Sequence, residues 1–342
     1  MPSSRGATET GSKGKWYSML KPPPGLLTVL GAINWDVSIF EDSFAGLGEE
    51  VPVRNVEEFS GGKGANVAVA AARLLGRNRA AFIGALGSDA IAKVQLRELR
   101  KEGVVTEGVV MVEGSRSGMA YIVVNREGKK SIHTHFGANA MIQPEDLESP
   151  GPAGVLARSS TLVVMDTPTQ VALAAVRRAR ASNTRVIYSP GVRVREGREA
   201  LKEIAGSCDF LVLDKAELAR LSGKTDAIQA TKFLQGSSPK MTVVATSGKG
   251  GCIVVDKGGL TRLPGVDLST LKMKAVNSTG SGDSFLGVLA SFLSGGTDPV
   301  EAARWANLAG ALKATRYETR GSPTKARLLS VMRTLQTSYP GR

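Results

Sequence analysis

The chain has 342 residues, of which 42% are hydrophobic and 22% charged, and its formal net charge is +13. This composition is typical of a globular protein and excludes a collagen, a coiled coil and a wholly disordered chain. No apolar run reaches the roughly 20 residues of a membrane span and the first residues lack the apolar core of a secretory signal, so we expect a cytoplasmic protein without a membrane partner.

The charge excess is concentrated near the two ends of the chain. Residues 1–24 carry four basic residues against one acid, and residues 311–342 carry seven against Glu318. Aromatic residues make up only 5% of the chain, and no basic stripe is interleaved with them, so a nucleic-acid partner is not expected. A generally basic surface that suits anionic ligands is the simpler interpretation.

The predicted elements begin after an arm of 24 residues that is rich in Ser, Gly, Lys and Pro, which we interpret as flexible. Short apolar runs then predict strands at 26–33, 80–86, 162–165, 185–188, 210–213 and 241–245. Helices are predicted at 65–75, 90–101, 169–180 and 216–221. Strands that are apolar on both faces are typical of a covered parallel sheet. We therefore expect a doubly wound, Rossmann-like α/β domain over residues 25–335, followed by a tail of residues 336–342.

Two segments, 36–60 and 104–136, lack helix signals and carry many β-branched or alternating positions. They predict a small antiparallel β-sheet inserted into the main domain as a lid over the strand ends. An uncovered apolar sheet face favours a partner, so a homodimer through the lid is expected.

A glycine-rich motif lies late in the chain. Gly280 and Gly282 precede a helix that the apolar spacing predicts from about Gly282 to the glycine pair at 295–296. The backbone of Gly280, Ser281 and Gly282 would form an anion hole for phosphate at this helix start. Asp283 stands beside the hole, where an attacking hydroxyl must lose its proton. The alternative is a plain first-turn Asp that the helix dipole favours.

A second glycine motif, residues 60–66, lies early in the chain and also enters a helix. It is not a Walker A loop, because no Ser or Thr follows Lys63. Lys63 and Asn66 supply hydrogen-bond donors beside small residues, which suits a polyhydroxylated ligand. The alternative is a tight turn at a helix entry.

Three polar residues follow predicted strands. Asn34 and Asp36 come after the first strand and Asp166 after a later one, where open α/β sheets bind ligands. Turn or cap roles are the commoner alternative for such residues. His133 and His135, the only two histidines, alternate along a predicted strand without an evident third ligand, so no metal site is predicted there.

Over residues 26–335 these segments together resemble the ribokinase-like (PfkB) family of sugar and nucleoside kinases. Residues 60–66 resemble the family's sugar-binding motif and residues 278–283 its catalytic motif. Within the family, residues 61–66 and 137–139 are most similar to ribokinases. The resemblance implies an ATP-dependent phosphotransferase that acts on a small sugar, ribose first. A nucleoside kinase, or a kinase of another sugar or sugar acid, is the alternative. A non-catalytic sensor of a sugar or nucleotide is a hypothesis of a different class.

The resemblance also implies roles for individual residues. Asp283 would be the general base beside the anion hole. The sugar hydroxyls would be held by Asn34, Asp36, Gly62, Lys63, Asn66 and Asp166. ATP would lie against Asp214, Glu217, Thr246, Gly248, Gly251 and Asn307, and Glu217 would organise Mg²⁺ through water.

Two positions depart from the family pattern. Asp214 stands where Asn is usual, and an extra anion near ATP phosphates would repel them unless Lys215 or the metal offsets it. Asn277 stands where Asp is usual, at a position that helps ribokinases to bind an activating monovalent cation. The loss of a carboxylate there weakens the case for K⁺ dependence. For a nucleoside acceptor, Tyr121 and Phe136 could stack on the base or simply pack in the core.

Overall fold

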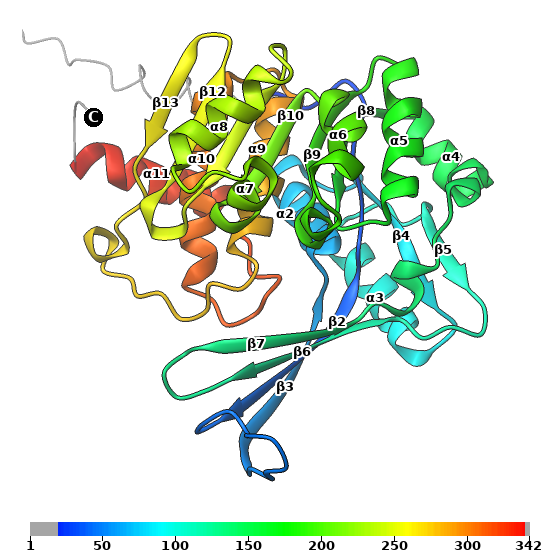
Figure 1. Ribbon diagram of the computed structural model, residues 1–342, viewed down its shortest axis with the longest axis vertical. Coiled ribbons are helices and arrows are strands. Elements are labelled where there is room, and N and C mark those ends of the chain that lie inside the picture. Colours follow the sequence, from blue (N-terminus) through cyan, green and yellow to red (C-terminus); the bar gives the residue numbers. More distant parts are fainter. Residues whose placement is uncertain (1–19, 339–342) are drawn as a thin grey trace, which may run out of the picture.

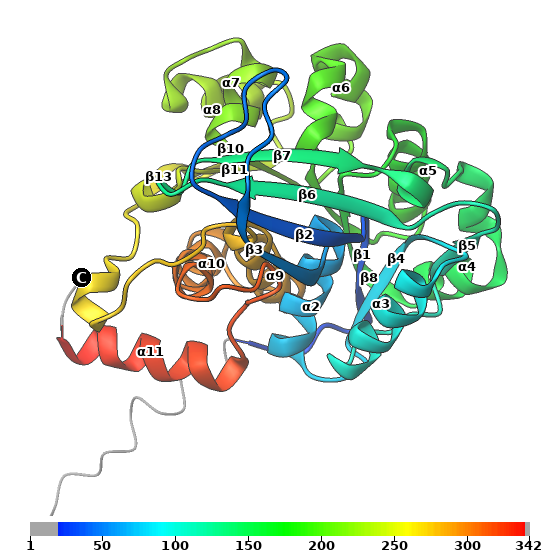
Figure 2. The ribbon, with the colours of Figure 1, turned by 90° about the horizontal axis from the view of Figure 1, so that it is seen from below.

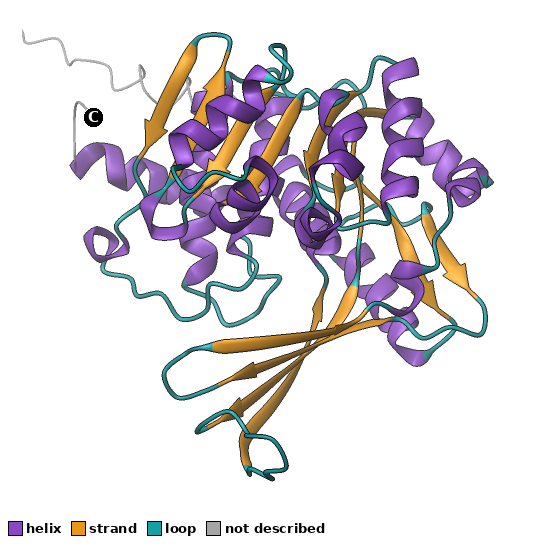
Figure 3. Ribbon diagram, in the orientation of Figure 1, coloured by secondary structure: helices purple, strands orange, loops and turns teal. Residues whose placement is uncertain are grey.

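The structure is a computed structural model that describes residues 20–338. A nine-stranded sheet runs through the body of the molecule with helices on both sides (Figures 1 and 3). In spatial order its strands are β13 (Gly259–Leu263), β12 (Cys252–Asp256), β11 (Thr242–Thr246), β10 (Phe210–Asp214), β9 (Arg185–Ser189), β8 (Ser159–Met165), β1 (Leu26–Gly31), β4 (Ala80–Gly87) and β5 (Val109–Val112). The strands from β11 to β5 pair in parallel, whereas β12 and β13 form an antiparallel edge.

Two hydrophobic clusters cover the two faces of this sheet. One is built from α2 (Lys63–Leu75), α3 (Ala90–Lys101), α9 (Ser281–Ser294), α10 (Pro299–Ala314) and α11 (Lys325–Ser338). The other is built from α4 (Pro150–Ala157), α5 (Thr169–Ala181), α6 (Arg198–Gly206), α7 (Lys215–Ser222) and α8 (Ala227–Gly236). The short helices η1 (Gly137–Ala140), η2 (Pro144–Glu148), η3 (Gly191–Glu196), η4 (Gly248–Gly250) and η5 (Leu268–Leu271) lie in the connections.

The predicted doubly wound fold is confirmed, and its physical cause is visible in β1. Val29 contributes to one cluster and Leu30 to the other, so alternate side chains of the strand are buried on opposite faces. All six predicted strands and all four predicted helices occur, with ends that differ by at most three residues. Strands β5, β12 and β13 were not predicted.

A four-stranded sheet, the lid, projects from one end of the main sheet and is seen from below in Figure 2. Its strands, in spatial order, are β3 (Val53–Gly61), β2 (Asn34–Glu41), β6 (Gly118–Val124) and β7 (Lys130–His135). Its outer pairs are antiparallel, as predicted, but the central pair β2–β6 is parallel. The boundary expected near residue 104 needs correction, because β5 pairs with β4 in the main sheet. A short apolar run has the same sequence pattern in the main sheet and in the lid, so the pattern did not show to which sheet β5 belongs.

The ends of the chain also differ from expectation. Residues 1–19 of the predicted basic arm lie outside the described residues. Leu20 belongs to a hydrophobic cluster and Pro23 is buried, so the last part of the segment expected to be flexible packs on the body. Helix α11 continues to Ser338, beyond the predicted domain end at residue 335, and residues 339–342 are not described. Within residues 20–338, none of the helices has the length and apolar character that a bilayer crossing requires.

Candidate active site

The site lies where the chain reverses direction in the main sheet. From β1 the chain continues to the β4 side, and from β8 it continues to the β9 side, although β1 and β8 are neighbours. Such a reversal leaves a crevice at the carboxyl ends of the two strands. As predicted, Asn34 and Asp36 follow β1, and Asp166 follows β8 directly.

Helix α9 begins at Ser281, one residue before the predicted start, and Gly280 caps it with a φ of 82°. A Cβ at position 280 would lie 2.1 Å from the carbonyl oxygen of Thr319, so both this conformation and the close approach require glycine. The Ser281 N–H donates to the carbonyl of Ser278 at 3.1 Å. Among residues 20–338, by contrast, no acceptor binds the N–H of Gly282, which is exposed. This amide is therefore left for an anion.

The early and late glycine motifs meet in one buried hydrogen bond. Asn66, near the start of α2, donates through Nδ2 to Oδ2 of Asp283, in the first turn of α9, at 2.9 Å. Burial raises the pKa of Asp283, while the bond from Asn66 and the charge of Lys63 oppose the rise. A carboxylate with a raised pKa, held beside a free helix-start amide, is suited to accept a proton.

Asp36, on lid strand β2, is buried against the C-terminal part of the chain. Thr319 donates through Oγ1 to Oδ2 of Asp36 at 2.9 Å. A Cβ at Gly61 would lie 2.1 Å from the same oxygen, so glycine there leaves room for the carboxylate. Burial raises the pKa of Asp36 to about 6, although Thr319 and the charge of Arg320 act in the opposite direction.

Lys63 and Asp166 form an ion pair of 2.9 Å at the mouth of the crevice. The other carboxylate oxygen of Asp166 accepts the N–H of Val192 at 2.7 Å. Asp166 has a φ of 55°, a conformation that non-glycine residues rarely adopt and that is often found at functional sites. Burial lowers the pKa of Lys63, but the charge and hydrogen bond of Asp166, together with the charges of Asp283 and Glu217, outweigh it and the net shift is upward.

Asn34 has most of its hydrogen-bonding capacity engaged by the protein. Its side-chain Oδ1 accepts from Nδ2 of Asn139 at 3.0 Å, and its backbone carbonyl accepts from Nε2 of Gln95 at 2.6 Å. Asn139 also bonds to both the N–H and the carbonyl of Ile33, each at 2.9 Å. Gly62 caps α2 with a φ of 88°. These bonds hold the β1–β2 connection, which leads into Asn34, in place.

Asp214 and Glu217 form a reciprocal capping box at the start of α7. Oδ1 of Asp214 accepts the N–H of Glu217 at 2.8 Å, and Oε2 of Glu217 accepts the N–H of Asp214 at 2.9 Å. The carboxylate that departs from the family pattern thus has a local role as a helix cap. Burial raises the pKa of Glu217 to about 7, and the charges of Asp214 and Asp166 add to the rise. A carboxylate that lies close to other carboxylates is suited to bind Mg²⁺, which typically takes one or two carboxylates together with nucleotide phosphates as ligands.

The four other residues assigned to the nucleotide lie at the β11–β13 edge. Thr246 ends β11, and the loop after it is closed by a bond of 2.8 Å from the Ser247 N–H to the Gly251 carbonyl. Gly248 and Gly251 have φ angles of 55° and 87°. Asn307, on α10, donates to the carbonyl of Pro264 at 3.3 Å, just beyond β13. The turn after β11 is thus closed locally, whereas Asn307 connects α10 to the end of β13.

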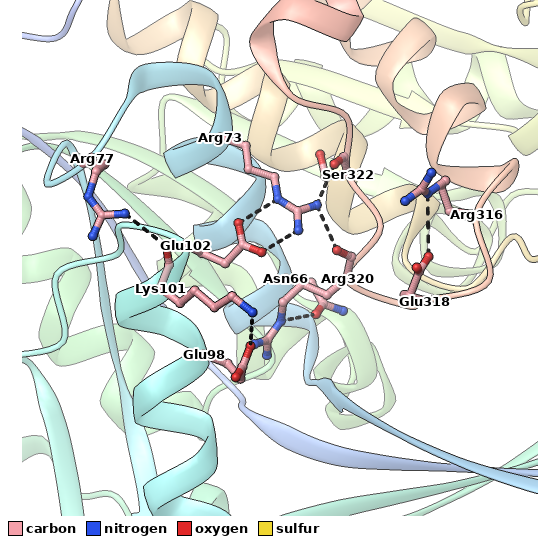
Figure 4. A network of polar contacts seen from close by, with 10 residues as sticks. All are labelled: Asn66, Arg73, Arg77, Glu98, Lys101, Glu102, Arg316, Glu318, Arg320 and Ser322. Carbon is pink, nitrogen blue, oxygen red and sulfur yellow. Dashed lines mark hydrogen bonds and ion pairs between the residues drawn. The ribbon is translucent and has the colours of Figure 1, made fainter.

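A network centred on Arg320 was not predicted (Figure 4). Its buried guanidinium donates through Nε to Oδ1 of Asn66 at 3.2 Å and through a terminal nitrogen to the carbonyl of Gly61 at 2.8 Å. Arg73 pairs with Glu102 at 2.6 Å and donates to the carbonyl of Arg320 at 3.0 Å. Arg320 therefore holds residues on the sugar side from behind. In the sequence, Arg320 is one of the C-terminal basic residues, and no local pattern distinguished it from an exposed charge.

The lid and the loop before α9 touch each other through Lys130, which donates from β7 to Oγ1 of Thr279 at 3.0 Å. Asn277, in the same loop, donates through Nδ2 to the carbonyl of Tyr317 at 2.7 Å, and its Oδ1 accepts the N–H of Thr279 at 2.9 Å. The carbonyl oxygen of Asn277 accepts from Nζ of Lys313 at 2.8 Å. The backbone N–H of Asn277 donates to the carbonyl of Ala314 at 3.0 Å, so all four polar atoms of Asn277 are engaged by protein groups.

Comparison with known proteins identifies the class. Residues 25–326 match the model of the pfkB family of carbohydrate kinases, and the chain belongs to this family. It is 29% identical over 296 residues to the ATP-dependent ribose-1-phosphate kinase of Halopiger xanaduensis, covering 86% of this chain and 93% of that protein. It is 26% identical over 273 residues to a bifunctional ribokinase/ribose-5-phosphate isomerase A of Fructilactobacillus sanfranciscensis, covering 78% of this chain but only 48% of that protein.

Among solved structures, ribokinase from Thermotoga maritima superimposes with a TM-score of 0.79 and 27% sequence identity. The match covers 90% of this chain and 99% of that chain. The protein is accordingly a sugar or nucleoside kinase of the ribokinase type, an ATP-dependent phosphotransferase. The family resemblance noted in the two glycine motifs is confirmed.

Proposed function

We propose that this kinase transfers the γ-phosphate of ATP to a hydroxyl of a small, ribose-like sugar, with Asp283 as the general base. The observation that supports this best is the hydrogen bond between Asn66 and Asp283, because it joins the sugar-binding motif and the catalytic motif in one buried site. Removal of the hydroxyl proton by the carboxylate makes the sugar oxygen a stronger nucleophile as its bond to phosphorus forms. A general base typically contributes about 10²–10⁴-fold to the rate.

The start of α9 stabilises the transferring phosphoryl group in this proposal. The amide of Gly282 and the positive end of the helix dipole face the developing negative charge. Gly280 acts through its left-handed conformation, which turns the chain into the helix. Ser281 contributes through the turn that its N–H closes with Ser278.

The sugar lies between the lid and α2 in this proposal. The carboxylates of Asp36 and Asp166 accept hydrogen bonds from sugar hydroxyls, and Lys63 and Asn66 donate to them. Asn34 and Gly62 shape the adjoining wall. The bonds that already hold these groups in place support the assignment, since preorganised groups lose little freedom when a ligand binds.

ATP lies toward the β11–β13 edge, against Thr246, Gly248, Gly251 and Asn307. When bound, Mg²⁺ supplies positive charge to the phosphates and neutralises the charge that develops on them. Glu217 is the acid best placed to hold it through water. Asp214 acts on the nucleotide side as the cap that orients Glu217.

A nucleoside kinase is the second candidate. Phe136, at the end of the lid strand β7, carries the Arg193 guanidinium 5.7 Å from its ring centroid, and this pair could receive a flat base. The other aromatic residue suggested for this role is unsuited to it. Tyr121 pairs with Val37, which neighbours Asp36 along β2, so Tyr121 lies on the face of the lid opposite to that of Asp36.

We also propose that the protein is a homodimer through the outer face of the lid and works in the cytoplasm. The register of the lid places Val56 and Tyr121 on the face that points away from Asp36, and their side chains are exposed by 49% and 38%. A second copy would cover these groups.

The proposed cytoplasmic location follows from the need for ATP and agrees with the two free thiols, Cys208 and Cys252.

The test is a panel of acceptors assayed for ATP consumption with Mg²⁺, in which we expect ribose to be the best sugar. A higher rate with inosine or adenosine than with any sugar would favour the nucleoside kinase. The variant Asp283→Asn, run in parallel, shows whether the measured turnover comes from this site. Tight ligand binding without turnover of any acceptor would contradict the proposal and favour a sensor.

Sedimentation of wild type and Tyr121→Glu tests the dimer.

A further inference from the structure

Lys313, in the last turn of α10, is a fully buried lysine at the back of the site. Its side chain has 0% exposure, and its Nζ donates to the carbonyl oxygens of Asn277 at 2.8 Å and of Arg316 at 3.4 Å. Among residues 20–338, no carboxylate lies within ion-pair distance of it. An ammonium group that is removed from water needs such oxygen ligands to offset the loss of hydration.

The side chain of Lys313 runs close to two glycines. A Cβ at Gly280 would lie 3.5 Å from Cε of Lys313, and a Cβ at Gly321 would lie 3.4 Å from the same atom. The lysine stem therefore passes directly behind the residue that caps α9. The ammonium lies within reach of the field at the catalytic centre, since the charges of Lys313 and Asp283 influence each other's pKa.

The two carbonyl ligands belong to different loops, one leading into α9 and one following α10. The same loops are joined by the bond from Asn277 to the Tyr317 carbonyl, and by bonds of 2.7 and 3.0 Å from the N–H groups of Val276 and Asn277 to the carbonyl of Ala314. One loop ends at the anion hole, and the other carries Thr319 and Arg320. The Lys313 ammonium thus connects the loop that leads to the proposed catalytic groups with the loop that carries Thr319 and Arg320.

The position also suits a cation electrostatically. The C-terminal end of α10 carries the negative end of the helix dipole, and backbone carbonyls are the ligands that proteins use to replace the hydration shell of K⁺. Burial lowers the pKa of Lys313 to about 8, and the charge of Asp283 opposes this shift. The amine is therefore mostly charged at neutral pH.

We propose that Lys313 is a positioning residue for phosphoryl transfer whose ammonium is a built-in monovalent cation. It fixes the loop that ends at Gly280 and adds positive charge behind the anion hole, so the enzyme requires no added monovalent metal ion. The inference rests on the proposed kinase function. At the position where Asn277 in place of Asp weakens the case for a bound K⁺, a covalently tethered cation takes the place of the free ion.

The first test uses the unmodified enzyme. Its rate is measured with the best acceptor in tetramethylammonium buffer, with and without KCl, and we expect no change. A severalfold activation by KCl would overturn the inference, and this result depends on no variant. Absence of turnover with every acceptor would instead contradict the proposed function.

The second test compares Lys313→Ala, which leaves a cavity lined by carbonyls, with Lys313→Met, which fills it without a charge. We expect both variants to lose at least about 10-fold in kcat, with a smaller change in the KM for the sugar. KCl or ammonium chloride should restore part of the rate of Lys313→Ala but not of Lys313→Met. The exposed Lys202→Met serves as the matched control and should match wild type. An unchanged rate in Lys313→Ala without cations would overturn the inference.

A binding measurement separates this inference from catalysis. KCl should raise the unfolding temperature of Lys313→Ala by more than that of the wild-type protein, since only the variant offers a vacant cation position. Equal shifts in both proteins would contradict a cation-like role for Lys313, whatever the enzyme phosphorylates.

Discussion

The sugar side and the nucleotide side of the site are built in different ways. On the sugar side the polar groups bond to residues far away in the chain, as in the pairs Asn66–Asp283 and Asp36–Thr319. On the nucleotide side the acidic pair and the turn after β11 bond within a few residues, as in the capping box of Asp214 and Glu217, although Asn307 reaches the carbonyl of Pro264. The proposed sugar pocket therefore depends on segments from the whole chain, whereas the proposed nucleotide edge is built largely from local turns.

This difference predicts different responses to mutation. Loss of one group on the sugar side leaves buried partners unsatisfied and affects residues of several elements. Loss of one group of the Asp214–Glu217 capping box affects a single helix start. The following predictions, from the largest effect to the smallest, test this contrast.

The largest effect is expected from Asp283→Asn. The amide keeps the shape of the side chain and can still accept from Asn66, but it cannot take a proton. We expect kcat to fall by at least about 10²-fold while ATP affinity stays unchanged, as measured by steady-state kinetics and calorimetry. The control is Asp298→Asn at the start of α10, where Asn caps equally well. Near-normal turnover of Asp283→Asn would remove this carboxylate from the proton transfer.

Arg320→Met tests the long-range bonds of the sugar side. The change leaves Asn66 Oδ1 and the Gly61 carbonyl without their charged donor, so we expect the free energy of unfolding to fall by about 3 kcal/mol, with a raised sugar KM. Denaturant unfolding provides the measurement. Arg316→Met, four residues earlier on an exposed side chain, should change stability by less than about 0.5 kcal/mol. Equal losses in the two variants would show that Arg320 does not hold the site together.

Asp36→Asn should act mainly on sugar binding. Removal of a charge-assisted acceptor corresponds to an increase in sugar KM of about 10-fold, with a smaller change in kcat and none in the KM for ATP. Steady-state kinetics at varied sugar and fixed ATP measures it. An unchanged sugar KM would exclude the assigned contact.

Because the pKa of Asp36 is raised, sugar binding and stability should depend on pH in opposite directions. Sugar binding needs the carboxylate, so the sugar KM of wild type should rise as the pH falls through about 6. Stability should change in the other direction, because the folded state favours the protonated form. The contribution of Asp36 to stability is full below its ordinary pKa near 3.8 and is lost as the pH rises through about 6. Both trends should be weaker in Asp36→Asn, and equal trends in the two proteins would contradict this assignment.

The smallest effect is expected at Asp214. Asp214→Ala removes the helix cap and should cost about 1 kcal/mol of stability, whereas Asp214→Asn keeps the cap and should cost nothing measurable. Because Asn carries no charge, the KM for MgATP should stay the same or fall in Asp214→Asn. Thermal unfolding and kinetics of the pair provide the measurements. A large loss of activity in Asp214→Asn would indicate that the carboxylate binds metal rather than only capping α7.

The strands of the main sheet could be predicted because a sheet covered on both faces leaves a local signal, an apolar run between turn residues. That signal weakens at the edges. In β13 only Leu263 is buried, and β5 is only four residues long, so neither was distinguished from loop or lid. The lid was predicted from its alternating pattern, but the parallel pairing of β2 with β6 depends on how two distant segments meet.

The residues of the two glycine motifs were found from their spacing, since a glycine before a helix start has a local physical reason. The partners of these residues were not found. Thr319 and Arg320 lie more than 250 residues from Asp36 and Asn66, and nothing in their own surroundings marks them as buried. The same holds for Lys313, whose two ligands are backbone carbonyls that any residue could supply.

The amino-acid sequence by itself determined the local features of this protein: the buried strands, the helix starts with their caps, and the glycines that permit the turn at α9. Only the tertiary structure decided which of the C-terminal basic residues are surface charges and which are parts of the site. Arg316 is exposed, while Lys313 and Arg320 are buried within a few residues of it. The physical reason is that the charge of a residue is a property of its own side chain, whereas its burial depends on the segments that fold around it.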